Sequence, residues 1–286
     1  MTEPTIDAIK SIDILSFCVV PITPFFNDVE LSSATGFFYS LVVDGTPTLW
    51  LVSNWHVFSG RQIGPPNKAL MLNGAIPNRI RFQVMKALPG NIVQVHHQFA
   101  NLYDADDKAF WRQHQSKSDV DIAGLNLGRG LDGFAVGGIN ENARYDMKIE
   151  IGNDVFVLGY PLGFSHFIST PIWKRGSIAS EPHAETPESR NRIMIDATTR
   201  SGMSGSPVIM REKTHYVSES GQVMQHVNAS RFIGVYSSRP AFAGKSASAI
   251  DGIEDRRTEL GYVYKAGCIE QIIREGIPGP EYGVLP

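Results

Sequence analysis

Three short segments of the sequence carry residue types that could perform acyl transfer together. One of them, residues 202–207, reads GMSGSP and places Ser204 in a glycine-flanked turn. A serine hydroxyl is a weak nucleophile at neutral pH, so it needs an adjacent base, and the oxyanion that it creates needs preorganised donors. Because glycines leave the backbone accessible, we predict that the N–H groups of Gly202 and Ser204 donate to that oxyanion.

The base and its orienting acid are predicted in two upstream segments. Residues 48–57 (TLWLVSNWHV) form an apolar strand that runs into His56, which predicts an imidazole held at a rigid strand end. Residues 118–125 (SDVDIAGL) carry acids into an apolar stretch that should be buried, where a carboxylate needs a partner such as an imidazole N–H. Asp119 and Asp121 would share one face of a strand, so their spacing does not choose between them.

Taken in the order His, Asp, Ser, these segments resemble the signature blocks of trypsin/chymotrypsin-like serine peptidases. The bacterial branch is most similar. Residues 34–39 (ATGFFY) and 51–56 resemble the opening of high-temperature-requirement and glutamyl-endopeptidase domains, and residues 202–208 resemble the glutamyl-endopeptidase nucleophile block. The likeness covers roughly residues 17–275. In the family the acid precedes an aliphatic residue and Ala, which selects Asp121.

The resemblance implies a serine endopeptidase that hydrolyses peptide bonds through an acyl-enzyme on Ser204. His56 would be its general base and Asp121 its orienting acid, and neither a metal nor an organic cofactor would be required. Met203 departs from the Asp or Asn that usually precedes the nucleophile, but this position contributes mostly backbone. The alternative is a catalytically inactive or partner-activated domain that acts as a protein- or peptide-binding module.

The resemblance also assigns residues that would bind substrate. Ser237 lies in the strand that pairs with extended substrate, at the position of the serine that contacts the buried acid. Thr199 matches a threonine that touches the substrate carboxylate in glutamyl endopeptidases, whereas Tyr236 replaces their histidine. Arg239 could reach into the pocket and favour an acidic side chain, or fill its mouth. Acidic and small apolar preferences both stay open, and the lack of an acid at the pocket base disfavours Lys or Arg.

Most of the elements that would position these residues are strands. The 27 glycines and 17 prolines separate short runs rich in Val, Ile, Phe and Tyr. We predict strands at 17–26, 34–43, 50–53, 80–86, 92–98, 121–127, 154–158, 192–196, 207–210 and 232–237, one helix at 268–275, and exposed loops at 181–191 and 214–230.

Such short strands fit barrels or sandwiches, and the resemblance makes the expected fold all-β, with two antiparallel six-stranded β-barrels of the chymotrypsin type and a C-terminal helix. Residues 1–140 would form the barrel that carries His56 and Asp121. Residues 141–286 would form the barrel that carries Ser204, together with the helix.

Composition limits the remaining classes of function. The 286 residues are 42% apolar with a formal charge of −3, which fits a globular domain and argues against nucleic acid as a partner. We expect the two cysteines to be free thiols, no membrane segment, and a cytoplasmic location. His96 and His97 would point to opposite faces of a strand, so no metal site is expected. A protein or peptide substrate is expected, and a regulatory protein that orders the polar loops is a further candidate partner.

Overall fold

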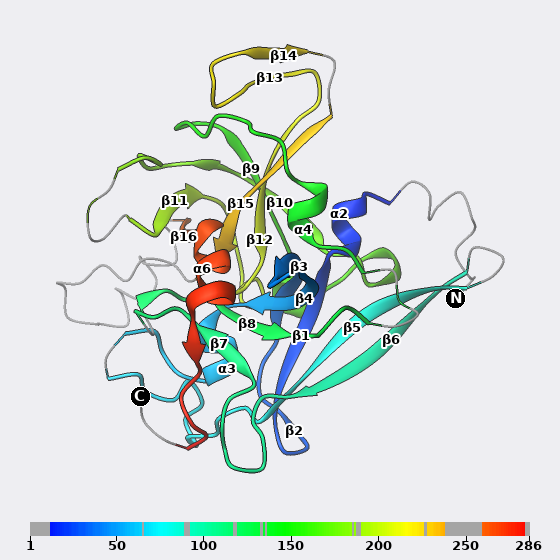
Figure 1. Ribbon diagram of the computed structural model, residues 1–286, viewed down its shortest axis with the longest axis vertical. Helices are drawn as coiled ribbons and strands as arrows, with labels where there is room; N and C mark the ends of the chain where they lie inside the picture. The colour runs from blue at the N-terminus through cyan, green and yellow to red at the C-terminus, as the bar shows by residue number, and fades with distance from the viewer. Residues whose placement is uncertain are drawn as a thin grey trace.

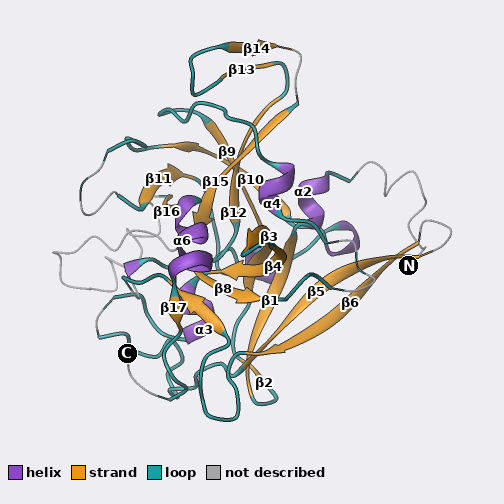
Figure 2. Cartoon of the chain, viewed as in Figure 1, coloured by secondary structure: helices purple, strands orange, loops and turns teal. Residues whose placement is uncertain are grey.

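Strands are the main regular secondary structure of the described chain, and Figure 2 draws them in orange. The computed structural model describes residues 12–64, 66–88, 92–116, 119–131, 134, 136–184, 186, 190–225, 228–237 and 259–283. Within them the helices are short: α2 (Ile14–Phe17), α3 (Trp55–Ser59), α4 (Ile139–Asn142) and α6 (Gly267–Glu275). Two single turns of 3-10 helix also occur, η2 (Pro161–Gly163) and η3 (Phe167–Ser169).

One antiparallel sheet combines the first half of the chain with its last strand. Within the described residues its order is β17-β7-β8-β4-β3-β1-β5-β6, and β2 pairs with β1. The strands are β1 (Val19–Phe26), β2 (Val29–Glu30), β3 (Ala34–Val43), β4 (Thr46–Ser53), β5 (Arg79–Leu88), β6 (Ile92–Asn101), β7 (Trp111–Gln113), β8 (Ala123–Asn126) and β17 (Ile277–Pro278).

This sheet differs from the closed six-stranded barrel that was expected for the first half. Strand β6 and strand β7 meet through the loop between them, not through a continuous row of strand hydrogen bonds. Leu102 follows β6 and Phe110 precedes β7, and the N–H of Phe110 donates to the Leu102 carbonyl at 2.9 Å. The loop between them folds back on itself at a bridge between Tyr103 and Ala109. Because this loop separates β6 from β7, the two strands do not pair and the path of paired strands stays open.

The second half of the chain forms a closed antiparallel barrel in the order β10-β11-β16-β15-β12-β9. Its strands are β9 (Asp154–Gly159), β10 (Ile172–Ile178), β11 (Arg192–Asp196), β12 (Pro207–Glu212), β15 (Ala229–Tyr236) and β16 (Leu260–Lys265). A separate hairpin of β13 (His215–Val217) and β14 (Val223–Gln225) projects beyond the barrel at the top of Figure 1.

Three hydrophobic clusters hold these layers together. One lies within the first sheet, one within the barrel, and the third draws side chains from both and from α2, α4 and α6. Side chains alternate along β3, so its three consecutive aromatic residues are buried in two places: Phe38 faces the first-sheet cluster, and Phe37 and Tyr39 face the cluster shared by both halves. The chain ends cross over between the halves: Asp13 beside α2 pairs with Arg211 of β12, and β17 pairs with β7.

The all-β, trypsin-like architecture and the C-terminal helix are confirmed, and the strands predicted at 34–43 and 192–196 have the predicted bounds. The loop prediction for 214–230 is wrong in part, because Tyr216 is buried and anchors the β13–β14 hairpin. The strand predicted from residue 121 begins at Ala123. The domain boundary at residue 140 stays a prediction, and α4 runs across that position.

Among the helices that the structure describes, none combines the length and the apolar character needed to cross a membrane.

Candidate functional site

His56 and Asp121 lie together at the end of β4. The strand stops at Ser53, so His56 sits in the first turn of α3 and not at the end of a strand as expected. Its ring Nδ1 is 2.8 Å from Asp121 Oδ2, and its backbone N–H donates to Asp121 Oδ1 at 3.0 Å. One carboxylate therefore fixes both the backbone and the ring of the histidine, leaving Nε2 as the nitrogen that is open to a reacting group.

A tight turn aims the Asp121 side chain. The Ile122 N–H donates to the Val120 carbonyl at 2.8 Å, which bends the chain around Asp121 before β8 begins. The Asp121 side chain is fully buried, whereas Asp119 is exposed. The two acids do not share one face of a strand, because this segment is not a strand, and only Asp121 is brought to His56.

The surroundings of Asp121 keep it ionised. Burial alone would raise the pKa of this carboxyl, but the His56 imidazole and a hydrogen bond from the Ser237 hydroxyl outweigh burial and hold it below its ordinary value. For His56, burial alone would lower the pKa, and the charge and hydrogen bond of Asp121 more than offset this, so that the pKa lies above its ordinary value. The pair is thus set up to accept a proton on the imidazole.

The turn that carries Ser204 comes from the other half of the molecule and leaves two donors open. The Ser201 carbonyl accepts from the Leu162 N–H at 2.6 Å, and the Met203 carbonyl accepts from the Ser206 N–H at 3.1 Å. In a trans peptide the N–H points opposite the carbonyl, so the N–H groups of Gly202 and Ser204 are directed away from these contacts. Within the described residues, no hydrogen bond uses either of these two N–H groups.

Close packing places this turn against the segment that precedes His56. Gly205 has a φ of +84°, and a Cβ added to it would lie 2.2 Å from Ser53 Oγ and 3.1 Å from Asn54 N. The Ser204 residue is half-buried and the His56 side chain is 18% exposed, so solvent or a substrate can reach both. Among the described residues no hydrogen bond joins their side chains, a contact that in free enzymes often tightens only when substrate binds.

The predicted substrate-binding residues are partly gathered beside this turn. Thr199 and Tyr236 are buried, and their hydroxyls share a hydrogen bond. Tyr236 is also hydrogen-bonded through its backbone to both Gly205 and Ser206. Ser237 donates its hydroxyl to Asp121, so it lies behind the carboxylate. Arg239 lies outside the described residues.

Two residues of the site had no role assigned from the sequence. Asn54 is fully buried and donates its side-chain amide to the Asp121 carbonyl at 2.7 Å, which holds the turn around the acid. Thr35 is fully buried on β3 and bonds to the Ser204 turn. Both occur within the motifs read from the sequence, and a polar residue inside an otherwise apolar strand was the available signal.

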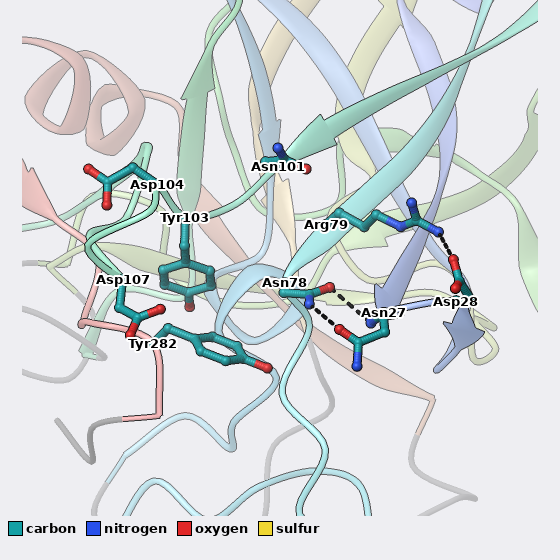
Figure 3. Close-up of a pocket in the computed structure, with 9 residues that line it drawn as sticks. All are labelled: Asn27, Asp28, Asn78, Arg79, Asn101, Tyr103, Asp104, Asp107 and Tyr282. Carbon is teal, nitrogen blue, oxygen red and sulfur yellow. Dashed lines mark hydrogen bonds and ion pairs between the residues drawn. The ribbon is translucent and has the colours of Figure 1, made fainter.

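A separate pocket of about 450 Å³ opens beside the β1–β2 turn, the start of β5 and the end of β6 (Figure 3). Its polar lining is already paired in part, since Asn27 and Asn78 bond to each other and Arg79 pairs with Asp28. None of the predicted site residues lines it. Within the described chain, no group of three or more potential metal-ligating side chains occurs here or elsewhere.

Comparison with known proteins gives a family for this chain. The family model of the trypsin-like peptidase domain matches residues 34–215. No curated protein matched the sequence. Similar solved structures include the HtrA-type protease AlgW with a tripeptide, at 14% identity and a TM-score of 0.44, and the protease Anisep from Arthrobacter nicotinovorans, at 13% identity and a TM-score of 0.46.

Both structural matches cover 90% of this chain. The chain spans 59% of the AlgW structure and 94% of the Anisep structure. The family model alone covers well over half of the sequence, and it includes His56, Asp121 and Ser204. The chain therefore belongs to the family of trypsin-like peptidase domains.

Proposed function

We propose that the protein is a serine endopeptidase whose nucleophile is Ser204. His56 Nε2 takes the hydroxyl proton as Ser204 Oγ attacks the peptide carbonyl, and the resulting oxyanion meets the N–H groups of Gly202 and Ser204. His56 then returns the proton to the leaving amine. Water, activated by the same imidazole, hydrolyses the acyl-enzyme and restores the free serine.

The observation that carries this proposal is the joining of an oriented base to an open donor pair. The His56–Asp121 hydrogen bond of 2.8 Å lies at the end of the first sheet, while the two N–H groups, unpaired within the described residues, lie in the turn between β11 and β12 of the barrel. Their meeting beside a half-buried serine is what acyl transfer requires.

Labelling with a fluorophosphonate probe tests the nucleophile directly, because the probe reacts with an activated serine. We expect wild type to be labelled, Ser204→Ala to be unlabelled, and Ser220→Ala, which alters an exposed serine between β13 and β14, to be labelled like wild type. Mass spectrometry should place the adduct on Ser204. A folded wild type that resists the probe would support the alternative of a non-cleaving binding module.

For the cleaved bond we further propose a preference for a small side chain on its carbonyl side. The Tyr236 ring packs so closely over Gly261 that a Cβ there would lie 2.3 Å from a ring carbon. Since Tyr236 is hydrogen-bonded to the Ser204 turn, its ring fills space beside the nucleophile and leaves little depth for a long side chain.

Cleavage of a peptide library by matched variants tests this preference. Wild type and Tyr236→Phe, which keeps the ring, should select small residues, and Tyr236→Val should accept larger ones. Enrichment of acidic residues in the wild type, lost in Arg239→Ala, would instead support the acidic preference and overturn this proposal.

A further inference from the structure

We propose that Thr35 is a positioning residue that shapes the oxyanion site from the opposite half of the molecule. This inference rests on the proposed function. Thr35 lies on β3 of the first sheet, is fully buried, and donates to two carbonyls of the Ser204 turn. Its hydroxyl donates to the Gly202 carbonyl at 2.8 Å, and its backbone N–H donates to the Ser204 carbonyl at 2.9 Å.

The consequence follows from the alternation of peptide units along the turn. The peptide between Gly202 and Met203 is held at both ends, because its carbonyl accepts from Thr35 and its N–H donates to the Arg200 carbonyl at 3.2 Å. The peptide between Ser204 and Gly205 is also held at both ends, by Thr35 and by the Tyr236 carbonyl at 3.1 Å.

The two units that offer the open N–H groups alternate with these fixed ones. Each is held only by its carbonyl, through Leu162 for the Gly202 donor and through Ser206 for the Ser204 donor. With the neighbouring units held in place, each open unit can turn only about the line that joins its two Cα atoms, and its own carbonyl hydrogen bond opposes that turn. The Thr35 contacts therefore fix the direction of both open donors, although Thr35 itself does not face the substrate.

Thr35 also links the turn to the segment that supports Leu162. Its hydroxyl oxygen accepts from the Tyr160 N–H at 3.1 Å while donating to Gly202. The fit around it is tight, since a Cβ on Gly159 would lie 2.8 Å from this oxygen. The Thr35 carbonyl accepts from the Ser53 hydroxyl at 2.7 Å, which connects the same residue to the strand that leads to His56. One residue thus links the nucleophile turn and the strand that leads to the base through its backbone, and the Gly202 and Tyr160 peptides through its hydroxyl.

The test compares Thr35→Val, which keeps the shape and removes the hydroxyl, with Thr35→Ser, which keeps the hydroxyl. Misplaced donors cost about 10- to 100-fold in rate, so we expect Thr35→Val to lower kcat by that factor with little change in KM, and Thr35→Ser to restore it. Thr48→Val is the matched control, because Thr48 also makes two hydrogen bonds with its hydroxyl, yet lies in the same sheet away from the site.

Amide hydrogen exchange gives a second readout that does not depend on activity. Thr35→Val should speed exchange in residues 159–163 and 200–206, and neither Thr35→Ser nor Thr48→Val should do so. The proposal would be overturned if Thr35→Val kept the wild-type kcat and the wild-type exchange rates. It would also be overturned if Thr35→Ser lowered kcat and sped exchange as much as Thr35→Val does. If wild type has no peptidase activity, the proposed function fails, and the exchange data still decide whether Thr35 orders the turn.

Discussion

Asp121 acts on His56 through both of its carboxylate oxygens, one on the backbone and one on the ring. A neutral imidazole that donates from Nδ1 must accept at Nε2, so the contact selects the tautomer that a serine needs. The buried charge is also satisfied from behind by the Ser237 hydroxyl. With these partners, a carboxylate can stay ionised in an interior where an unpaired one would be protonated.

The pH dependence of peptide hydrolysis should report this pair. Because Asp121 holds the pKa of His56 above its ordinary value of 6.5, and because only neutral His56 can act as a base, kcat/KM should fall as the pH drops through that raised pKa. In Asp121→Asn the charge is lost, so the inflection should move to lower pH and the rate on the plateau should fall by about 10⁴-fold.

Asp119→Asn is the control for that experiment, because Asp119 is exposed and makes no side-chain contact with His56. It should keep both the wild-type inflection and the wild-type plateau. An unchanged profile in Asp121→Asn would mean that another group orients the base.

The individual site residues differ in how far the sequence could identify them. The prediction of Ser204 and its two N–H donors combined the glycine-flanked stretch 202–207 with the His56 and Asp121 segments upstream, all of which can be read locally. The choice of Asp121 over Asp119 depends on a turn of three residues that no periodicity reveals. The bonds of Thr35 to the Ser204 turn join positions 167 or more residues apart, so only the fold could show them.

At the scale of elements, the turn between β11 and β12 is shaped by two glycines with left-handed backbone, Gly202 and Gly205. Gly202 has a φ of +91°, and a Cβ there would lie 2.3 Å from the Tyr160 carbonyl oxygen. The left-handed backbone is one constraint and the contact with the β9–β10 connection is the other. The effects of these two constraints can be separated by comparison with a second glycine that has a left-handed backbone but no close contact.

Gly202→Ala and Gly221→Ala form that matched pair. Gly221 has a φ of +82°, but a Cβ there would meet nothing within 4 Å. Both substitutions should lower the free energy of unfolding by about 1–2 kcal/mol through the backbone, and Gly202→Ala should lower it further because its Cβ would meet the Tyr160 carbonyl oxygen. Only Gly202→Ala should also lower kcat/KM, by about 10²-fold or more, since it displaces an oxyanion donor. Denaturant unfolding and steady-state kinetics measure the two effects, and equal activity in both variants would contradict the assignment of Gly202.

The elements also show where strand prediction succeeds and where it does not. Strands β3 and β11 were predicted with their observed bounds because turn residues or polar residues flank their β-branched and aromatic runs. Strand β10 was missed, since its sequence IWKRGSI carries two cations and a glycine and its side chains are mostly half-buried. Helix α3 was missed because five residues are too few for a helical period to appear.

At the scale of the whole molecule, the two halves are held together mainly by the hydrophobic cluster to which both contribute side chains, and less by any single hydrogen bond or ion pair between them. The cluster includes Phe37 and Trp50 from the first sheet, Ile209 and Val235 from the barrel, and Ile269 from α6. Burial of apolar surface on this scale is the main favourable term in folding. The site lies where the two halves meet, so its geometry depends on the integrity of this cluster.

The two cysteines offer a direct measure of that integrity, because both belong to the shared cluster. Burial raises the pKa of Cys18 to about 12 and that of Cys268 to about 11, so neither forms a thiolate near neutral pH. We expect no reaction of the folded protein with a thiol reagent such as DTNB at pH 8, and reaction of both thiols after unfolding in guanidinium chloride. Rapid modification of the native protein would contradict the burial of these residues.

The crossing of the chain ends has a consequence for how substrate must enter. Asp13 and Ser16 at the beginning of the described chain bind the barrel through Arg211 and Trp173, while β17 near its end is a strand of the first sheet. A terminal segment of each half thus binds to the other half, and these contacts oppose any hinge motion that would separate the two halves. We expect substrate to bind along the junction between the two halves without the halves moving apart. X-ray scattering should therefore give the same radius of gyration with and without a covalent inhibitor.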